Sequence, residues 1–405
     1  MRRSREDREI WLAETLLAAA GLLVAVPVLT LLVQVLASLL RAPAAELPDV
    51  GRPRVAVLVP AHNEQFAIRG TLASISNQLS GDDRLVVVAD NCLDHTAEAA
   101  RQQGAEVTVR NERSLRGKGY ALDHGVRFLE KTSAPDVVIF VDADCMVKPG
   151  SIDRLARTCI KSMRPVQGAY LMNPPRPQRR SASMVAFAWK VRDFVRPLGW
   201  NRLSLPCQLS GSGMAFPWEL VRTADLASNH LVEDLKQGLD LALAGQFSIF
   251  CPEAIVTSDV VKGGEPSYAQ RARWEHGTIA TMLQYYPRLL IRLCQTRSLQ
   301  LLAVTLDLSV PPLALLALAL AFYLVTASVY AGLFHGVVPL VIGCMNCILL
   351  LACIFLAWWG HGQDILPFRW LAFAPVYALR KVPLYCRFFL DRQSEWVRGE
   401  RNLRN

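Results

Sequence analysis

The chain alternates between long apolar stretches without charge and segments in which apolar and polar residues mix. Residues 15–40 contain no charged side chain, and the same holds for residues 308–329 and 337–359. Each stretch is long enough to cross the hydrocarbon core of a bilayer as a helix. We therefore predict one span at about 15–40 and a two-helix hairpin late in the chain. The first stretch is too long for a cleaved signal peptide.

The last part of the chain is apolar but not uninterrupted. Residues 365–389 contain Arg369, Arg380, Lys381 and several prolines, which favours a segment lying at the membrane interface over one that crosses. The tail beyond Arg380 is basic and contains Arg387, Arg392, Arg398, Arg401 and Arg404.

These patterns divide the chain into four parts. We predict an N-terminal segment with its span (1–51), a domain of soluble composition (52–297), the transmembrane hairpin (298–360), and an interfacial helix with the basic tail (361–405). Basic residues favour the cytoplasmic side, so the tail and the large domain are expected there. This places the N-terminus outside, which conflicts with the same rule because arginines stand at positions 2, 3, 5 and 8.

Residues 52–297 begin with alternating strand-like and helix-like patterns. Short β-branched runs stand at 55–60, 85–90, 106–110 and 137–144, and helical patterns follow the first three at 64–78, 96–104 and 117–130. This order predicts a mostly parallel sheet with crossover helices, a nucleotide-binding type of α/β fold.

Polar residues stand where three of these strands end: Glu64 after the first, Asp90 at the end of the second, and Asp142 with Asp144 after the last. Ligands of parallel sheets bind at the carboxyl ends of the strands. In extended chain Asp142 and Asp144 point to the same face, and their repulsion favours a bound divalent cation or a tight hydrogen-bond network. Taken alone, such a pair at a strand end can equally be a loop cap or a solvated edge.

Two later helical patterns add candidate chemistry. The helix predicted over 231–245 has Glu233 and Asp234 at its start. Negative side chains interact favourably with the helix dipole at this end, and that alone could explain why acidic residues stand there. In the helix predicted over 268–277, Gln270, Arg273 and Trp274 share a face. That face could bind an anionic group beside a sugar. Equally, the segment could be a basic amphipathic helix that approaches the membrane.

Composition narrows the class of protein. Of 405 residues, 52% are hydrophobic and only 20% charged, which is typical of a membrane protein. The net charge of +9 comes largely from arginines near the membrane boundaries, so anionic lipid is expected as a partner and nucleic acid is not. The close pair Cys344 and Cys347 falls inside a predicted membrane helix and is interpreted as packing.

The ordered set of motifs resembles the membrane-bound glycosyltransferases of family 2, which have a GT-A fold and include bacterial exopolysaccharide glycosyltransferases and ceramide glucosyltransferases. The resemblance covers about 52–280. The matching segments are VPAHNE (59–64), VVVADNC (86–92), RGKGYAL (116–122), DAD (142–144), ED (233–234) and QRARW (270–274).

The resemblance implies a role for each matched residue around a nucleotide sugar, usually a uridine diphosphate sugar. Glu64 and Asp90 would bind the base and ribose, Lys118 would approach the phosphate side, and Asp142 would lie near the ribose and diphosphate. Asp144 would bind Mg²⁺ or Mn²⁺, and Asp234 would be the catalytic base. Gln270 would position the substrate, Arg273 would contact the diphosphate, and Trp274 would face the acceptor.

The expected function is inverting transfer of a sugar to a lipid-linked or membrane-associated acceptor, in polysaccharide or glycolipid synthesis at the cytoplasmic face of the cell membrane. The alternative is a processive polysaccharide synthase acting as a homo-oligomer. A phosphotransferase using Asp142 as nucleophile is disfavoured because Met146 stands where that class has threonine or valine. A catalytically silent membrane scaffold is the remaining alternative.

Overall fold

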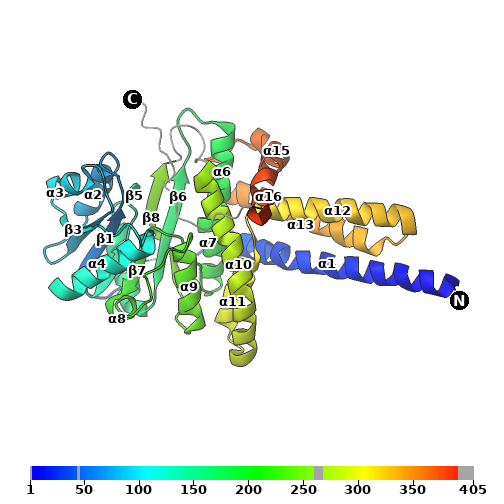
Figure 1. The fold of residues 1–405 in the computed structure, drawn as a ribbon, viewed down its shortest axis with the longest axis horizontal. Helices are drawn as coiled ribbons and strands as arrows, with labels where there is room; N and C mark the ends of the chain where they lie inside the picture. Colours follow the sequence, from blue (N-terminus) through cyan, green and yellow to red (C-terminus); the bar gives the residue numbers. More distant parts are fainter. Residues whose placement is uncertain (1, 43–45, 260–267, 391–405) are drawn as a thin grey trace.

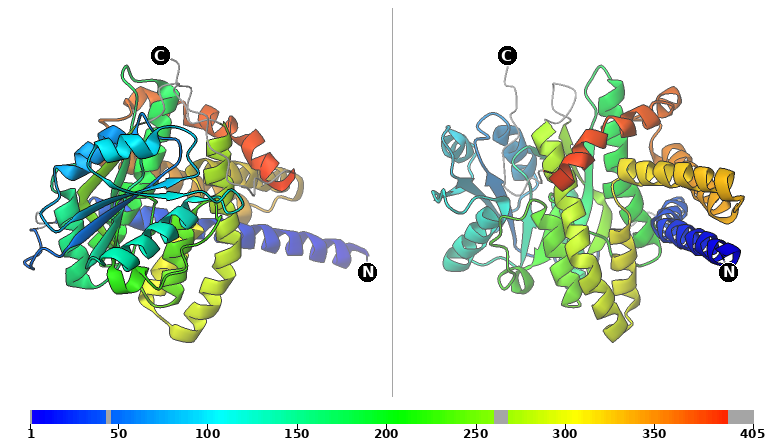
Figure 2. Two further views of the ribbon diagram at one scale, coloured as in Figure 1. Left: turned by 60° about the vertical axis from the view of Figure 1, so that its left-hand side comes forward. Right: turned by 45° about the vertical axis from the view of Figure 1, so that its right-hand side comes forward.

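The computed structural model of the chain describes residues 2–42, 46–259 and 268–390 (Figure 1). Most of the basic tail, including Arg392, Arg398, Arg401 and Arg404, lies outside the described residues. A sheet with helices on its faces forms one end of the molecule, and three long helices extend from the other end (Figures 1 and 2).

The sheet has eight strands in the order β3-β2-β1-β4-β7-β6-β8-β5. β1 to β4 pair in parallel, whereas β7 runs antiparallel to its neighbours β4 and β6. The predicted α/β class is confirmed, with the parallel pairing concentrated in the N-terminal half. The strands are β1 (Val55–Ala61), β2 (Arg84–Asp90), β3 (Glu106–Arg110), β4 (Val137–Phe140), β5 (Cys145–Val147), β6 (Val166–Asn173), β7 (Met214–Pro217) and β8 (Ile249–Asp259).

Both faces of the parallel half are buried, which explains its nearly continuous apolar runs. Val57 and Val59 of β1 belong to a core shared with helices α2 and α5, whereas Leu58 packs in a second core against α4. The helices of this domain are α2 (Ile68–Ser76), α3 (Thr96–Gln102), α4 (Lys118–Thr132), α5 (Ser151–Ser162), α6 (Arg180–Lys190), the π-helix η1 (Val191–Val195), α7 (Arg196–Arg202), α8 (Trp218–Val221), α9 (Glu233–Leu243) and α10 (Tyr268–Thr296).

The acidic pair does not lie on a strand. β4 ends at Phe140, and Asp142 and Asp144 lie in the turn before β5. The backbone N–H of Cys145 donates to the Asp142 carbonyl at 3.1 Å and closes this turn. The prediction that strand alternation sets the two side chains on one face was therefore wrong, because the chain leaves the sheet before it reaches them.

Three helices among the described residues are long and apolar enough to cross a membrane: Arg8–Ser38 within α1 (Arg2–Ser38), α12 (Leu313–Phe334) and α13 (Val338–His361). They run side by side away from the sheet (Figures 1 and 2). Tyr323 of α12 donates its hydroxyl to the carbonyls of Leu17 and Pro339 at 3.1 and 3.0 Å, and such interhelical hydrogen bonds favour association of apolar helices.

Shorter helices lie between the sheet and the three long ones. They are α11 (Leu299–Ser309), α14 (Phe368–Leu371), α15 (Ala374–Leu379) and α16 (Val382–Leu390). The last three fall in the segment predicted to lie at the membrane interface, and Figure 1 shows α15 and α16 beside the base of the long helices.

A buried polar cluster joins the first long helix to the sheet domain. Gln34 of α1 donates to the Asp307 carboxylate of α11 at 2.5 Å, and Arg196 of α7 donates to the same carboxylate at 2.7 Å. All three side chains are buried. Because each charge has its partner, the cluster fixes the position of the first long helix against the domain without leaving an unpaired charge.

Candidate active site

All nine candidate residues from the sequence line one cavity of about 700 Å³. It opens at the carboxyl edge of the parallel strands and reaches across to α9 and α10. The nine are Glu64, Asp90, Lys118, Asp142, Asp144, Asp234, Gln270, Arg273 and Trp274. Residues separated by about 200 positions in sequence thus form a single wall.

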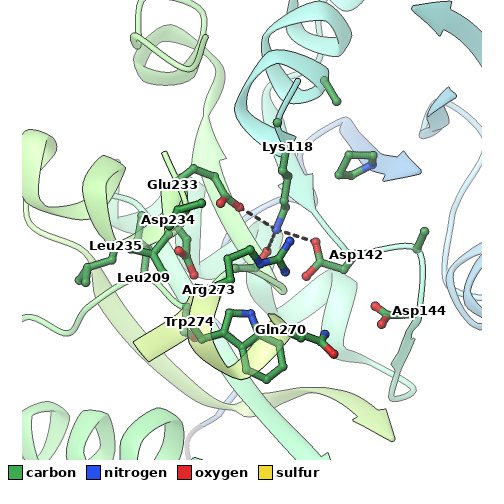
Figure 3. A pocket seen from close by; sticks show the side chains of 18 of the residues that line it. Lys118, Asp142, Asp144, Leu209, Glu233, Asp234, Leu235, Gln270, Arg273 and Trp274 are labelled. Atoms are coloured by element: carbon green, nitrogen blue, oxygen red, sulfur yellow. Dashed lines mark hydrogen bonds and ion pairs between the residues drawn. The ribbon is translucent and has the colours of Figure 1, made fainter. Parts of the chain in front are cut away.

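Lys118, at the first position of α4, stands at the centre of the polar part of this cavity (Figure 3). Its Nζ lies 2.6 Å from Asp142 Oδ1 and 3.4 Å from Glu233 Oε1, and it donates to the Gly211 carbonyl at 2.7 Å. Burial alone would lower the pKa of the ammonium, but the surrounding carboxylates raise it. Lys118 is therefore protonated and neutralises part of the acidic cluster.

Asp142 and Asp144 form the candidate metal site. One ligand atom from each, together with the Cys145 sulfur, lies within 4.8 Å of the others. Burial raises the pKa of Asp142 to about 6, against the attraction of Lys118. Burial also raises the pKa of the Cys145 thiol, and hard divalent cations prefer oxygen to sulfur ligands. The donors are then carboxylate oxygens, which fit Mg²⁺ or Mn²⁺.

Glu233 and Asp234 occupy the first two positions of α9, on the side of the cavity opposite Asp144 (Figure 3). Burial raises the pKa of both carboxyl groups, and Lys118 opposes the shift in each. Gly211 approaches closely: its φ is +92°, and a Cβ there would stand 3.0 Å from Asp234 Oδ2. A side chain at position 211 would therefore obstruct access to the Asp234 carboxylate.

Helix α10 supplies the third wall. Gln270, Arg273 and Trp274 all face the cavity, and the Arg273 guanidinium points to the space between Asp142 and Glu233 (Figure 3). Burial lowers the Arg273 pKa, and the carboxylates of this cavity oppose that shift. The Trp274 ring packs edge-on against Trp189 of α6 at 5.1 Å.

The remaining end of the cavity is formed by Glu64 and Asp90. Asp90 is 7% exposed and accepts from Arg110 at 2.7 Å and from the Asn91 amide at 3.0 Å. The backbone N–H of Glu64 donates to the Thr96 hydroxyl at 2.7 Å. These contacts hold the loops after β1 and β2 side by side, so a flat ligand between them meets two acidic residues.

Sequence reasoning missed several further residues of the wall, among them Trp189 and Arg192. The Arg192 guanidinium lies 4.1 Å from the Trp189 ring centroid and pairs with Asp193 at 2.8 Å. Its charge also opposes the rise that burial causes in the pKa of Asp234. Residues 187–195 look like an ordinary amphipathic helix in sequence. The π-helical turn over Val191–Val195, a feature frequent at functional sites, is visible only in the structure.

The cavity can therefore hold a large polar ligand with several charges. A cation at Asp142 and Asp144, with Lys118 and Arg273, provides positive charge for a diphosphate. Asp234 provides a buried carboxylate that can accept a proton. Trp189 and Trp274 provide flat apolar surface at the end nearest the long helices.

Comparison with known proteins supports this interpretation. Residues 53–277, more than half of the chain, match the family described as "Glycosyltransferase like family 2". The probable glycosyltransferase YdaM of Bacillus subtilis is 24% identical over 251 residues, which cover 58% of this chain and 57% of the relative. The 4,4'-diaponeurosporenoate glycosyltransferase of Staphylococcus haemolyticus is 25% identical over 202 residues, 45% of this chain and 50% of that protein. The chain thus spans about half the length of these relatives.

The fold also has a counterpart among solved structures. A mannosyltransferase from Pyrobaculum calidifontis, solved in complex with GDP-mannose and Mn²⁺, superposes with a TM-score of 0.51. The two are 18% identical, and the match covers 87% of this chain and 99% of the mannosyltransferase. This likeness confirms the GT-A type of fold.

Proposed function

Because the chain belongs to glycosyltransferase family 2, we propose that it is an inverting, metal-dependent enzyme that transfers a sugar from a nucleotide sugar to a lipid-linked acceptor at the membrane surface. The observation that carries the proposal is the shared cavity, in which a candidate metal site, two basic side chains and a buried carboxylate face one another. The three long apolar helices support a membrane location.

The donor would lie along the cavity from Glu64 to Arg273. We assign the base and ribose to the end formed by Glu64 and Asp90, and the diphosphate to the space between Asp142, Lys118 and Arg273. Two fixed cations there stabilise the negative charge that develops on the leaving diphosphate. We propose a uridine diphosphate sugar as donor.

Mg²⁺ or Mn²⁺ would be held by Asp144 and Asp142 and would supply Lewis-acid stabilisation of the leaving group. The carboxylate oxygens of both residues are within reach of one ion. Asp142 accepts from Lys118 as well, so its oxygens are shared between the ammonium and the ion. The likeness to a mannosyltransferase solved with Mn²⁺ agrees with this assignment.

The transfer needs one base and one displacement. The acceptor hydroxyl loses its proton to the Asp234 carboxylate as its oxygen bonds to the anomeric carbon of the sugar. The bond from that carbon to the diphosphate oxygen breaks, and its electron pair leaves with the diphosphate. A single displacement inverts the anomeric configuration. The raised pKa of Asp234 makes its carboxylate a stronger base than an exposed one.

The acceptor side of the cavity faces the membrane helices. Trp189 and Trp274 stand there, and the cavity extends to Asp307 at the end of α11. We propose that the sheet domain lies on the cytoplasmic side of the cell membrane. The basic pair Arg380 and Lys381 joins α15 to α16, and these two helices lie at the end of the long helices nearer the sheet (Figure 1).

The proposal is tested with purified protein in lipid nanodiscs, supplied with radiolabelled uridine diphosphate sugars, GDP-mannose, Mn²⁺ and extracted membrane lipids. We expect hydrolysis or transfer with at least one donor, its loss on chelation, and its loss in Asp234→Asn. The variant Asp82→Asn, at an exposed position, serves as the matched control.

Transfer that persists after chelation would contradict the metal dependence, and undiminished transfer by Asp234→Asn would contradict the role of Asp234 as the base. The length of the glycan on the product separates a single addition from processive synthesis.

A further inference from the structure

A second cavity, of about 180 Å³, lies beside the first on the side of the long helices. Its walls come from α6 and α10 of the sheet domain, from the connection between α11 and α12, from α12 and α13, and from α15 at the membrane interface. The cavity is therefore bounded partly by catalytic-domain helices and partly by helices predicted to enter the bilayer.

The two cavities share part of their walls. The residues that line both are Trp189, Arg192, Gln208, Leu235, Trp274 and Thr278. Leu235 follows Asp234 directly in α9, so the second cavity begins one residue from the proposed base. A ligand with its hydroxyl at Asp234 can extend into this space without crossing the donor site.

The lining of the second cavity suits a hydrocarbon chain. Most of it is apolar, including Met184, Leu313, Ala317, Ile354 and Ala374. A hydrocarbon chain can therefore pass from the bilayer into this cavity without leaving an apolar environment.

The charged groups of this wall are already paired. Lys381 donates to Glu275, and Arg196 to Asp307. A sugar would need several free polar partners, whereas a hydrocarbon chain needs none.

We propose that the second cavity binds the first carbons of the acceptor's hydrocarbon chain, and that the acceptor is a single-chain lipid alcohol. The inference rests on the proposed function and names the class of acceptor. A volume of about 180 Å³ is close to the roughly 150 Å³ apolar cavity that holds one small aromatic ligand. It admits one chain segment and excludes the paired chains of a diacyl lipid.

The test uses the full chain in phosphatidylcholine nanodiscs and a long-chain alkanol that carries a diazirine near its hydroxyl end. After irradiation, mass spectrometry locates the labelled residues. We expect labelling of the cavity walls around Leu313 and Ala317 of α12 and Ala374 of α15. An unlabelled long-chain alkanol should compete, and a soluble oligosaccharide should not.

The variant Ala317→Phe fills the cavity, and Ala319→Phe places the same side chain on the exposed face of the same helix. Because the phenylalanine ring would occupy the space of the chain, labelling of the cavity walls should be lost in Ala317→Phe, and the control should keep full labelling. Hydrolysis of the nucleotide sugar should survive in both variants.

The outcomes separate the two proposals. Labelling of the unsubstituted protein spread over the outer faces of α12 and α13, labelling unchanged by Ala317→Phe, or competition by the oligosaccharide would each overturn the cavity assignment while donor hydrolysis persists. Absence of hydrolysis with every nucleotide sugar would instead overturn the proposed function, and with it the role of this cavity in binding an acceptor. Because the labelling of the unsubstituted protein is read independently, the test stands even where Ala317→Phe fails to fold.

Discussion

The Nζ of Lys118 lies 2.6 Å from Oδ1 of Asp142, so part of the positive charge that offsets the acidic pair is a side chain of the protein itself. Glu233 lies on the other side of the same ammonium at 3.4 Å. Lys118 thus links the candidate metal site to the acidic start of α9. A change of charge at either place alters how strongly the Lys118 ammonium stabilises the carboxylates at the other.

Replacing Lys118 by Met should strengthen metal binding in the absence of donor while weakening transfer. Without the ammonium, Asp142 loses its nearest cation, so a divalent ion gains affinity there. Isothermal titration with Mn²⁺ measures the first effect, and transfer assays the second. Weaker Mn²⁺ binding in a folded Lys118→Met protein would contradict this account of the site.

Asp234→Asn should lower the rate of transfer by about 10²–10⁴-fold, the usual contribution of a positioned base, while the nucleotide sugar still binds. Glu233→Gln should cost less, because Glu233 neighbours the proposed base and contacts Lys118. Rates under saturating donor and equilibrium binding of the donor separate the two effects. Equal losses in both variants would point to a structural role of the whole acidic start of α9.

The rate of transfer should fall toward low pH along a limb that lies above the usual aspartate pKa of about 3.9. Burial raises the pKa of Asp234. The base acts in its deprotonated form, so activity is present above the raised pKa and is lost as the pH falls through it. The measurement is the pH dependence of kcat, with circular dichroism confirming that the protein stays folded across the range.

Arg273→Lys should reduce kcat by roughly 10²-fold, the scale of one lost contact to developing charge. A lysine keeps the charge but loses the planar fork that contacts two oxygens at once. Arg292→Lys, at an exposed position of the same helix, is the matched control. A loss confined to KM would assign Arg273 to donor binding alone.

Gly199→Ala should destabilise the contact between the sheet domain and the first long helix. A Cβ at Gly199 would stand 2.0 Å from the backbone carbonyl oxygen of Gln34, and overpacking of this kind costs about 1–3 kcal/mol. Gly332→Ala in α12 meets nothing within 4 Å and is the control. Thermal unfolding in nanodiscs should show a lower midpoint for Gly199→Ala only.

The class of the fold and the candidate residues were readable from sequence because both depend on local patterns. Strand-like runs such as that of β1 repeat at the spacing of crossover helices, and the carboxyl ends of parallel strands meet at one edge by topology. This is why the residue pattern alone places Glu64, Asp90, Asp142 and Asp144 in one group. Their roles in binding and catalysis are proposals that the experiments above test.

Other features depended on where separate elements meet. The local pattern around Asp142 is that of a strand, but pairing of β4 ends at Phe140. Residues 187–195 read as a regular helix, and the π-helical turn that accompanies Arg192 at the cavity is not encoded by periodicity.

By itself, the sequence determined the α/β layer, the apolar lengths that suit a membrane, and the set of acidic and basic side chains, because hydrophobic period and residue type act over a few positions. Only the tertiary structure decided that Lys118 neutralises Asp142, that Gln34 is buried against Arg196 and Asp307, and that an apolar cavity adjoins Asp234. These relationships join residues far apart in the chain, and their distances follow from how whole elements pack.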